Sequence, residues 1–188
     1  MKKASILLGS LLMLLSFSAF GQTSEKLVSS KTHMKFYSHT AVEDIEANNY
    51  ASVSTINTET GEVVFSVPMQ SFEFEKSQMQ KHYNSDKFLD TKEYPKAKLK
   101  GKITNLSDVD FTKDGIYSVV VEGDLTIKGK TNAITENGTI DVKGKTVKVQ
   151  SKFNINLADY GITFAKGKPS TNIAKEVEVT VHSEYSAE

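Results

Sequence analysis

The side chains that could coordinate a metal or move protons are few and scattered in this sequence. They are four histidines (His33, His39, His82 and His182) and one cluster of acids (Glu43, Asp44 and Glu46). A metal site would need carboxylates beside the histidines, because the sequence contains no cysteine. His33 and His39 share one parity and Met34 has the other, so in a strand both histidines would face solvent. Neighbouring carboxylates can act as acid and base, but clustered surface acids are far more common. Neither set predicts a metal ligand or a catalytic residue.

Three further patterns resemble known sites but fail on spacing. The tripeptides 129–131 and 144–146 both read Gly-Lys-Thr, as in a phosphate-binding loop, yet the preceding glycine lies one residue too far upstream. Each tripeptide also lies between strand-like runs, so hairpin turns are the simpler interpretation. The acids Asp108, Asp110 and Asp114 do not match the positions of a calcium-binding loop, and no serine lies in the glycine-flanked turn of a hydrolase. We therefore expect no catalytic residue, no metal site and no cofactor.

Residues 1–21 have the features of a secretory signal peptide. Lysines at the start precede an apolar run from Ala4 to Phe20, and Ala19 and Gly21 place small residues before the expected cleavage site. The run is shorter than the roughly 20 residues that cross a bilayer, and without cysteine the chain cannot be acylated as a lipoprotein. We expect a mature chain that does not span a membrane and is periplasmic or secreted.

The mature chain, residues 22–188, has the length of a single domain. The 23 basic residues, less Lys2 and Lys3 in the leader, stand against 23 acidic ones, a net charge of about −2. This charge gives no broad attraction for nucleic acid. The alternate lysines from Lys96 to Lys102 are typical of the solvent face of a strand. No sequence feature indicates an oligomeric state.

Alternation of apolar and polar residues is the dominant pattern of the mature chain. The clearest run extends from Val147 to Leu157, where the odd-numbered residues are apolar or small and the even-numbered ones are Lys, Gln or Asn. Four other runs alternate in the same way: Val63, Phe65 and Val67; Tyr117, Val119, Val121, Leu125 and Ile127; Ile134, Ile140 and Val142; and Val177, Val179 and Val181. Glycines separate the runs. The pattern predicts an antiparallel all-β fold in which each strand has one apolar face.

Strands with a single apolar face must close into a barrel or stack as two sheets to hide that face. The runs of about eight to eleven residues exceed the usual strand length of about five to six, which favours an elongated barrel. Its inward candidates are large: Met34, Phe36, Phe65, Phe72, Phe74, Phe153, Tyr160 and Phe164. Such residues could fill the barrel or line a channel through it, and the alternation does not decide between the two.

One segment, from about Glu75 to Tyr94, interrupts the alternation with a helix-like pattern. Met79 and Tyr83 would share a helical face. Phe88 adds further apolar surface to a connector that is otherwise polar. We expect this segment to pack across one end of the barrel as a lid.

Three blocks of residues occur in a recognisable order over nearly the whole mature chain. The first is Met79, Phe88, Leu89, Asp90, Tyr94, Pro95 and Ala97; the second is Gly123, Leu125, Thr126, Ile127, Gly129 and Thr131; the third is Phe153, Ile155, Asp159, Tyr160, Gly161 and Ile162, with Glu176 and Val177 near the end. Together these blocks resemble the YceI-like family of bacterial secreted proteins. The resemblance implies an antiparallel lipocalin-like β-barrel that binds polyisoprenoid lipids.

The sequence departs from the family pattern at three places. Lys31 and Thr32 stand where family members usually have a His-Ser pair, and the chain has no tryptophan. Leu157 stands in place of an arginine, and the chain contains no arginine, so the resemblance implies no headgroup contact at this position. Residues 43–49 replace a glycine-containing segment, as in a short branch of the family associated with Bacteroidota.

The resemblance implies a binding protein that holds an isoprenoid or quinone-type lipid in an apolar channel and is not an enzyme. The residues expected to contact lipid are Met34, Phe36, Phe65, Val67, Phe72, Phe74, Met79, Tyr83, Phe88, Leu99, Val119, Val121, Leu125, Phe153, Ile155, Leu157 and Tyr160. Two alternatives stay open. A small-barrel isomerase or cyclase would need inward polar groups, for which the candidates are Tyr83, Tyr117, Tyr160 and Glu122. A plugged barrel acting in adhesion or stress response would have a filled lumen.

Overall fold

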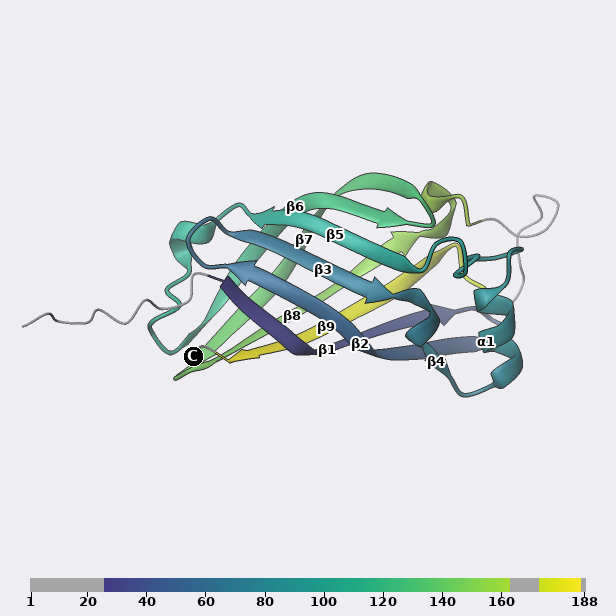
Figure 1. Cartoon of the computed structure of the whole chain (residues 1–188), viewed down its shortest axis with the longest axis horizontal. Helices are drawn as coiled ribbons and strands as arrows, with labels where there is room; N and C mark the ends of the chain where they lie inside the picture. The colour runs from purple at the N-terminus through teal and green to yellow at the C-terminus, as the bar shows by residue number, and fades with distance from the viewer. Residues whose placement is uncertain (1–25, 163–172, 187–188) are drawn as a thin grey trace, which may run out of the picture.

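The computed structural model describes residues 26–162 and 173–186 (Figure 1). Its elements are β1 (Lys26–His39), β2 (Asp44–Asn57), β3 (Glu62–Pro68), η1 (Met69–Ser71), β4 (Glu73–Phe74), α1 (Ser77–Asn84), β5 (Lys96–Ile103), η2 (Leu106–Asp108), β6 (Gly115–Ile127), β7 (Lys130–Lys143), β8 (Thr146–Asn156), η3 (Leu157–Tyr160) and β9 (Glu176–Ser186). The expected leader, residues 1–21, and Phe164 lie outside the described residues.

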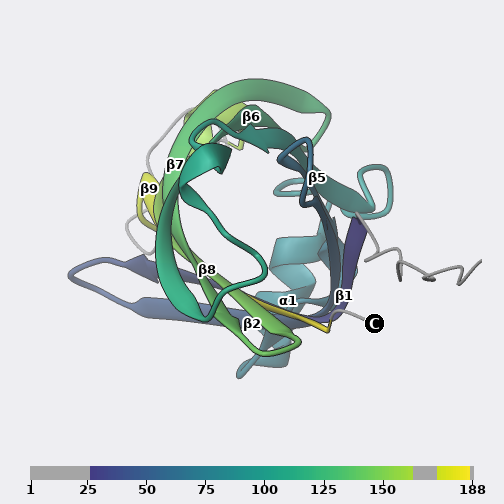
Figure 2. The ribbon, with the colours of Figure 1, turned by 90° about the vertical axis from the view of Figure 1, so that its left-hand side faces the viewer.

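Eight long antiparallel strands form a closed barrel in the order β1-β9-β8-β7-β6-β5-β3-β2, and pairing of β1 with β2 completes the ring (Figure 2). The short strand β4 pairs only with β2, at its edge. Each strand presents its apolar face to the lumen, because a closed ring leaves no other place to bury it. The predicted all-β barrel with one short helical insert is therefore confirmed.

The two Gly-Lys-Thr tripeptides form hairpin turns, as predicted. Gly129 and Gly144 have φ angles of 73° and 57°, in the left-handed region that glycine tolerates best. These turns connect β6 to β7 and β7 to β8. The alternate lysines Lys96 to Lys102 of β5 are all exposed, which confirms that they form an outer face.

Strands β5 and β6 approach each other closely at a pair of facing glycines. Gly101 lies opposite Gly123 in the ladder. A Cβ atom on Gly123 would lie 2.4 Å from the Cα atom of Gly101 and 2.4 Å from the carbonyl oxygen of Lys100. The wall at this point requires residues without side chains.

The end of the barrel away from α1 is packed solid. Leu27, Ile56, Ile103, Ile140, Val142 and Val147 are buried there, and Leu106, Val109 and Phe111 from the β5–β6 connection pack against the same core. The lumen is therefore closed at this end.

A hydrogen-bonded cluster of hydroxyl groups lies above this packed end. Thr32 Oγ1 and Ser54 Oγ are 3.0 Å apart, Ser54 Oγ and Tyr185 OH are 2.7 Å apart, and Ser183 Oγ donates to Thr32 Oγ1 at 3.0 Å. Ser29 joins them by accepting a hydrogen bond from Thr32 Oγ1 at 3.4 Å, and its own hydroxyl donates to the carbonyl oxygen of Glu184 at 2.6 Å. Pairing within the cluster avoids the cost of burying unsatisfied polar groups. The cluster separates the packed end from the rest of the lumen.

The insert forms a helix only over Ser77–Asn84, and residues 85–94 continue as turns. The helix ends where the backbone N–H of Ser85 bonds to the carbonyl oxygen of His82, an oxygen that the Ser85 hydroxyl also binds. A helix of eight residues is marginal by itself, so its stability depends on packing against the barrel. Among the described residues, no helix is both long and apolar enough to cross a membrane.

Candidate functional site: an apolar cavity under a helical lid

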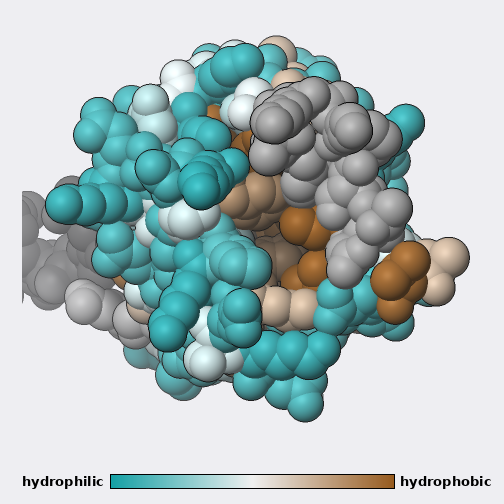
Figure 3. Space-filling model, turned by 90° about the vertical axis from the view of Figure 1, so that its right-hand side faces the viewer, coloured by the Kyte–Doolittle hydropathy of each residue, from teal (hydrophilic) through white to brown (hydrophobic). Residues whose placement is uncertain are grey.

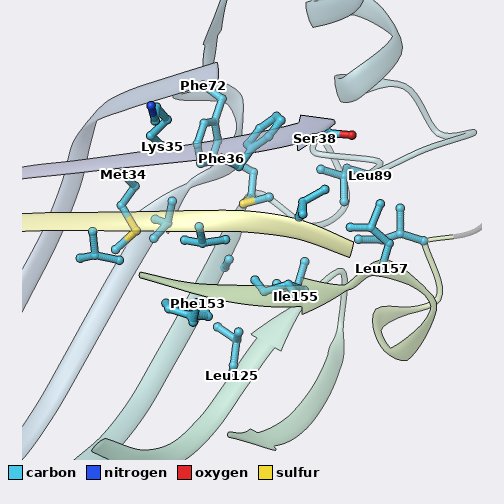
Figure 4. Close-up of a pocket in the computed structure, with 18 of the residues that line it drawn as sticks. Met34, Lys35, Phe36, Ser38, Phe72, Leu89, Leu125, Phe153, Ile155 and Leu157 are labelled. Carbon is cyan, nitrogen blue, oxygen red and sulfur yellow. The ribbon is translucent and has the colours of Figure 1, made fainter. Parts of the chain in front are cut away.

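The barrel encloses a cavity of about 620 Å³ between the hydroxyl cluster and α1. In Figure 3, apolar residues line a recess at the α1 end, within a rim that is mainly hydrophilic. Figure 4 shows Met34 and Phe36 of β1, Leu125 of β6 and Phe153 of β8 around the same space. The lumen is therefore hollow over one part and filled over the other.

Sixteen of the seventeen residues expected to contact lipid line this cavity. The exception is Tyr160, which is buried but is not part of the lining. Tyr160 belongs to η3, after the end of β8, so the inward–outward alternation of β8 does not determine the direction of its side chain. Phe153 faces the cavity and is half-buried. Contact between these residues and a ligand stays a prediction.

An aromatic cluster holds the lid on the barrel. The ring of Tyr83, on α1, lies with its centroid 5.0 Å from that of Phe74, 5.7 Å from those of Phe36 and Phe72, and 6.5 Å from that of Phe88. Tyr83 is only 5% exposed, and burial raises the pKa of its phenol well above the usual value. The expectation that the insert packs across one end of the barrel is confirmed.

The turns after α1 are fixed by their own hydrogen bonds. Thr91 is fully buried, and its hydroxyl donates to Asn84 Oδ1 at 2.7 Å. Lys128, in the β6–β7 turn, donates from Nζ to the carbonyl oxygen of Phe88. The lid is therefore tied to a hairpin of the wall as well as to the aromatic cluster.

The rim of the cavity carries charged and polar groups. Those that also line the cavity are Lys35, Glu43, His82, Ser85, Lys87 and Lys98. Two of the rim charges are paired: Lys35 Nζ lies 3.3 Å from Glu46 Oε2, and Glu43 Oε1 lies 2.9 Å from Lys76 Nζ. The acid cluster at the start of β2 thus forms surface ion pairs, which contribute little stability.

Glu136 of β7 faces the cavity, and the sequence pattern did not single it out. It is an even-numbered residue of β7, like Ile134 and Ile140, and this shared parity is the sequence signal that could have identified it as inward-facing. Burial raises the pKa of its carboxyl group. Apart from Glu43 at the rim, it is the only carboxylate in the described part of the cavity wall.

The inward polar groups named for an isomerase or cyclase do not converge. Glu122 is exposed on the outer face of β6, because Val121 takes the inward position beside it; the expectation of an inward Glu122 was wrong. Tyr117 lies towards the packed end, where its hydroxyl donates to the carbonyl oxygen of Lys113 at 2.9 Å. Tyr83 lines the cavity, but its hydroxyl points to Met69 Sδ, 4.0 Å away.

The histidines do not gather into a metal site. His33 and His39 lie on the outer face of β1, as predicted: His33 stacks on exposed Tyr50, with ring centroids 4.6 Å apart, and His39 lies 2.6 Å from Asp44. Within residues 26–162 and 173–186, no three His, Asp or Glu side chains lie close enough to hold a metal ion.

The sequence model of the YceI-like domain matches residues 20–185, nearly the whole length of the chain. The chain belongs to the YceI-like family. The resemblance drawn from the three sequence blocks is therefore confirmed, and the hollow barrel is this chain's version of the family fold. No curated protein sequence matches the chain.

Solved structures with the same fold are distant in sequence. A polyisoprenoid binding domain from Saccharophagus degradans, described as implicated in plant cell wall breakdown, has a TM-score of 0.72 at 15% identity, covering 87% of this chain and 99% of that one. BcnA from Burkholderia cenocepacia has a TM-score of 0.68 at 18% identity, covering 81% and 95%. The YCEI protein of Campylobacter jejuni has a TM-score of 0.55 at 16% identity, covering 100% and 99%. At these identities the similarity establishes the fold.

Proposed function

We propose that this protein binds a polyisoprenoid or a similar single-chain amphiphile in the apolar cavity and shields the chain from water. The observation that carries the proposal is the cavity itself: about 620 Å³, lined mainly by aliphatic and aromatic side chains, and covered by a lid that adds Met79, Tyr83 and Phe88 to the lining. This volume falls within the range of about 300–1,000 Å³ that is usual for small-molecule sites. The description of the Saccharophagus degradans domain as polyisoprenoid binding supports the same ligand class.

The energetics favour a chain of several isoprene units. Each buried CH₂ group contributes about 0.8 kcal/mol, so one five-carbon unit contributes roughly 3–4 kcal/mol before the cost of ordering the chain. Phe65, Val119 and Phe153 supply apolar contacts from three different strands. Storage, transport or shielding of a lipid needs no catalytic group, and we propose that the protein is not an enzyme.

The test uses one variant that fills the cavity and one that does not. Leu99 lines the cavity between Phe65 and Leu125, its neighbours in the ladder, whereas Lys100 is exposed on the outer face of the same strand. We expect Leu99→Trp to weaken binding of geranylgeraniol at least tenfold, and Lys100→Trp to bind like the unaltered protein. The chain has no tryptophan, so each variant also reports on its own surroundings by fluorescence. Equal affinity in both variants, with both folded, would contradict the proposal.

We also propose that the protein is exported and that residues 1–21 are removed. The supporting features are the basic start, the apolar run and the small residues Ala19 and Gly21. The intact mass of protein recovered from the periplasm or medium of its host should correspond to a chain that starts at Gln22. A chain that keeps the apolar run, or one that starts before Ser18, would contradict this assignment.

A further inference from the structure

The inner wall of the cavity carries a carboxylate, Glu136, from the middle of β7. Glu136 lies opposite Val121 in the β6–β7 ladder, and both side chains line the cavity. Along β7 its inward neighbours are Ile134 and Gly138. The carboxylate is therefore set among apolar neighbours.

Glu136 has no partner that neutralises it. Its side chain forms no hydrogen bond and no ion pair with any residue in 26–162 or 173–186. Burial is the cause of its raised pKa, and no lysine offsets the effect. The pKa of Tyr160 is raised by burial and, to a smaller extent, by the charges of Asp159 and Glu136. A partly buried carboxylate without a partner favours a ligand group that donates a hydrogen bond.

The wall is split beside Glu136. The ladder between β7 and β8 ends at the pair Gly138 and Ser151, although β7 begins at Lys130 and β8 continues to Asn156. Beyond the last pair, β7 bonds only to β6 and β8 only to β9. The hydroxyl of Ser151 closes the ladder by donating to the carbonyl oxygen of Asn137 at 2.7 Å.

An outer groove meets the cavity at this split. The groove has a volume of about 640 Å³ and is lined by polar residues of four strands, among them Gln150, Lys152 and His182. Four residues line both the groove and the cavity: Val119, Asn137, Gly138 and Ser151. Gly138 has no side chain to separate the two spaces. A polar head near Glu136 can therefore stay hydrated while its chain lies in the apolar cavity.

We propose that Glu136 and the neighbouring split form the headgroup subsite, and that it selects an amphiphile whose head donates a hydrogen bond and carries no negative charge. A hydroxyl or an ammonium group has this chemistry, whereas a phosphate or carboxylate is repelled by Glu136. The lysine of the adjoining groove, Lys152, is already paired with Glu178, 2.9 Å away. The inference rests on the proposed lipid-binding function. The competing arrangement places an anionic head at the rim, beside Lys87 and Lys98, where Glu136 has no influence.

The experiment compares three probes that share one chain and differ in their heads: geranylgeraniol, geranylgeranylamine and geranylgeranyl phosphate. Dissociation constants at pH 8 are measured for the unaltered protein, for Glu136→Gln and for Glu122→Gln. The Glu122 variant is the matched control, because it removes one negative charge from the outer face of the neighbouring strand. Thermal unfolding of each protein verifies that the barrel is intact.

We expect the unaltered protein and Glu122→Gln to bind the alcohol and the amine at least tenfold more tightly than the phosphate. Glu136→Gln should tighten phosphate binding at least fivefold and weaken amine binding by a similar factor, with alcohol binding unchanged within threefold. The ratio of the dissociation constants for the amine and the alcohol then identifies which donor the subsite prefers. The subsite is overturned if Glu136→Gln leaves the ratio of the dissociation constants for the phosphate and the amine unchanged. It is also overturned if the unaltered protein binds the phosphate more tightly than the alcohol and the amine. Failure of all three probes to bind any of the proteins overturns the lipid-binding proposal, and the subsite with it.

Discussion

The lid gives the sharpest test of how a bound chain would be released. Met79 and Phe88 are half-buried, line the cavity and belong to the lid, whereas fully buried Tyr83 supplies its main anchor. Replacing Met79 and Phe88 together by serine removes apolar contacts between the lid and both the barrel and its contents. The barrel ladders are untouched, because neither residue belongs to a strand.

The expected magnitude follows from the burial of the two side chains. Full burial of a Met or Phe side chain contributes about 1.5–3 kcal/mol, so two half-buried ones together contribute about the same, roughly 1.5–3 kcal/mol. Since about 1.4 kcal/mol corresponds to a factor of ten, the double variant should release a prenyl lipid roughly 10- to 100-fold faster. Retention of Tyr83 should keep the lid folded against its aromatic partners.

The assay is transfer of a fluorescent prenol from the loaded protein to acceptor vesicles, with circular dichroism as the measure of folding. Gln78 lies one position before Met79 and Asp86 two positions before Phe88, and both are exposed, so the double variant Gln78→Ser, Asp86→Ser is the matched control. Unchanged release in a folded Met79→Ser, Phe88→Ser protein would refute the lid as a gate. Global unfolding of that variant would instead show that the insert is part of the folding core.

Three other perturbations test the barrel wall and the buried phenols. Phe153→Ala should weaken lipid retention and lower the free energy of unfolding by about 1–2 kcal/mol, as measured by denaturant unfolding. This loss is smaller than the 3–5 kcal/mol expected for a fully buried phenylalanine, because Phe153 is half-buried. Gly123→Ala should destabilise by about 1–3 kcal/mol, because its Cβ atom would lie 2.4 Å from the backbone of β5. Gly144→Ala, with nothing within 4 Å of its Cβ atom, should cost only the left-handed backbone strain, and equal losses in both glycine variants would contradict the close approach. Burial raises the pKa of the phenols of Tyr83 and Tyr185. Their contribution to stability is therefore complete below about pH 10 and is lost as the pH rises through their folded-state pKa values. Tyrosinate absorbance from these two residues should appear together with loss of the β-sheet dichroism signal.

The sequence determined the sheet and the direction of most of its side chains. In a strand, successive residues point to opposite faces whatever the partner strands are, so parity alone places Val149, Phe153 and Ile155 inside and Lys148 outside. The same local rule identified the hairpin turns, and the length of the runs favoured a barrel. These features depend on near neighbours in the chain, which is why they can be predicted from it.

Parity failed wherever the backbone departs from a regular strand. In β1 the inward residues change from odd to even numbers between Ser29 and Thr32, because the pairing with β2 shifts register there. Tyr160 lies in a 3-10 turn and so is buried without lining the cavity. Glu136 was overlooked because polar residues and a glycine interrupt the apolar pattern along β7.

Only the tertiary structure decided that the lumen is hollow and where it is hollow. The aromatic residues of β1 and of the lid could equally have filled the lumen, but they gather around Tyr83 at the mouth. The far end is filled by aliphatic residues from several strands, and the hydroxyl cluster joins residues more than 100 positions apart in the sequence, such as Ser54 and Tyr185. The empty volume depends on how side chains from eight strands fill one shared lumen. It is therefore determined by the closure of the barrel and not by any local sequence pattern.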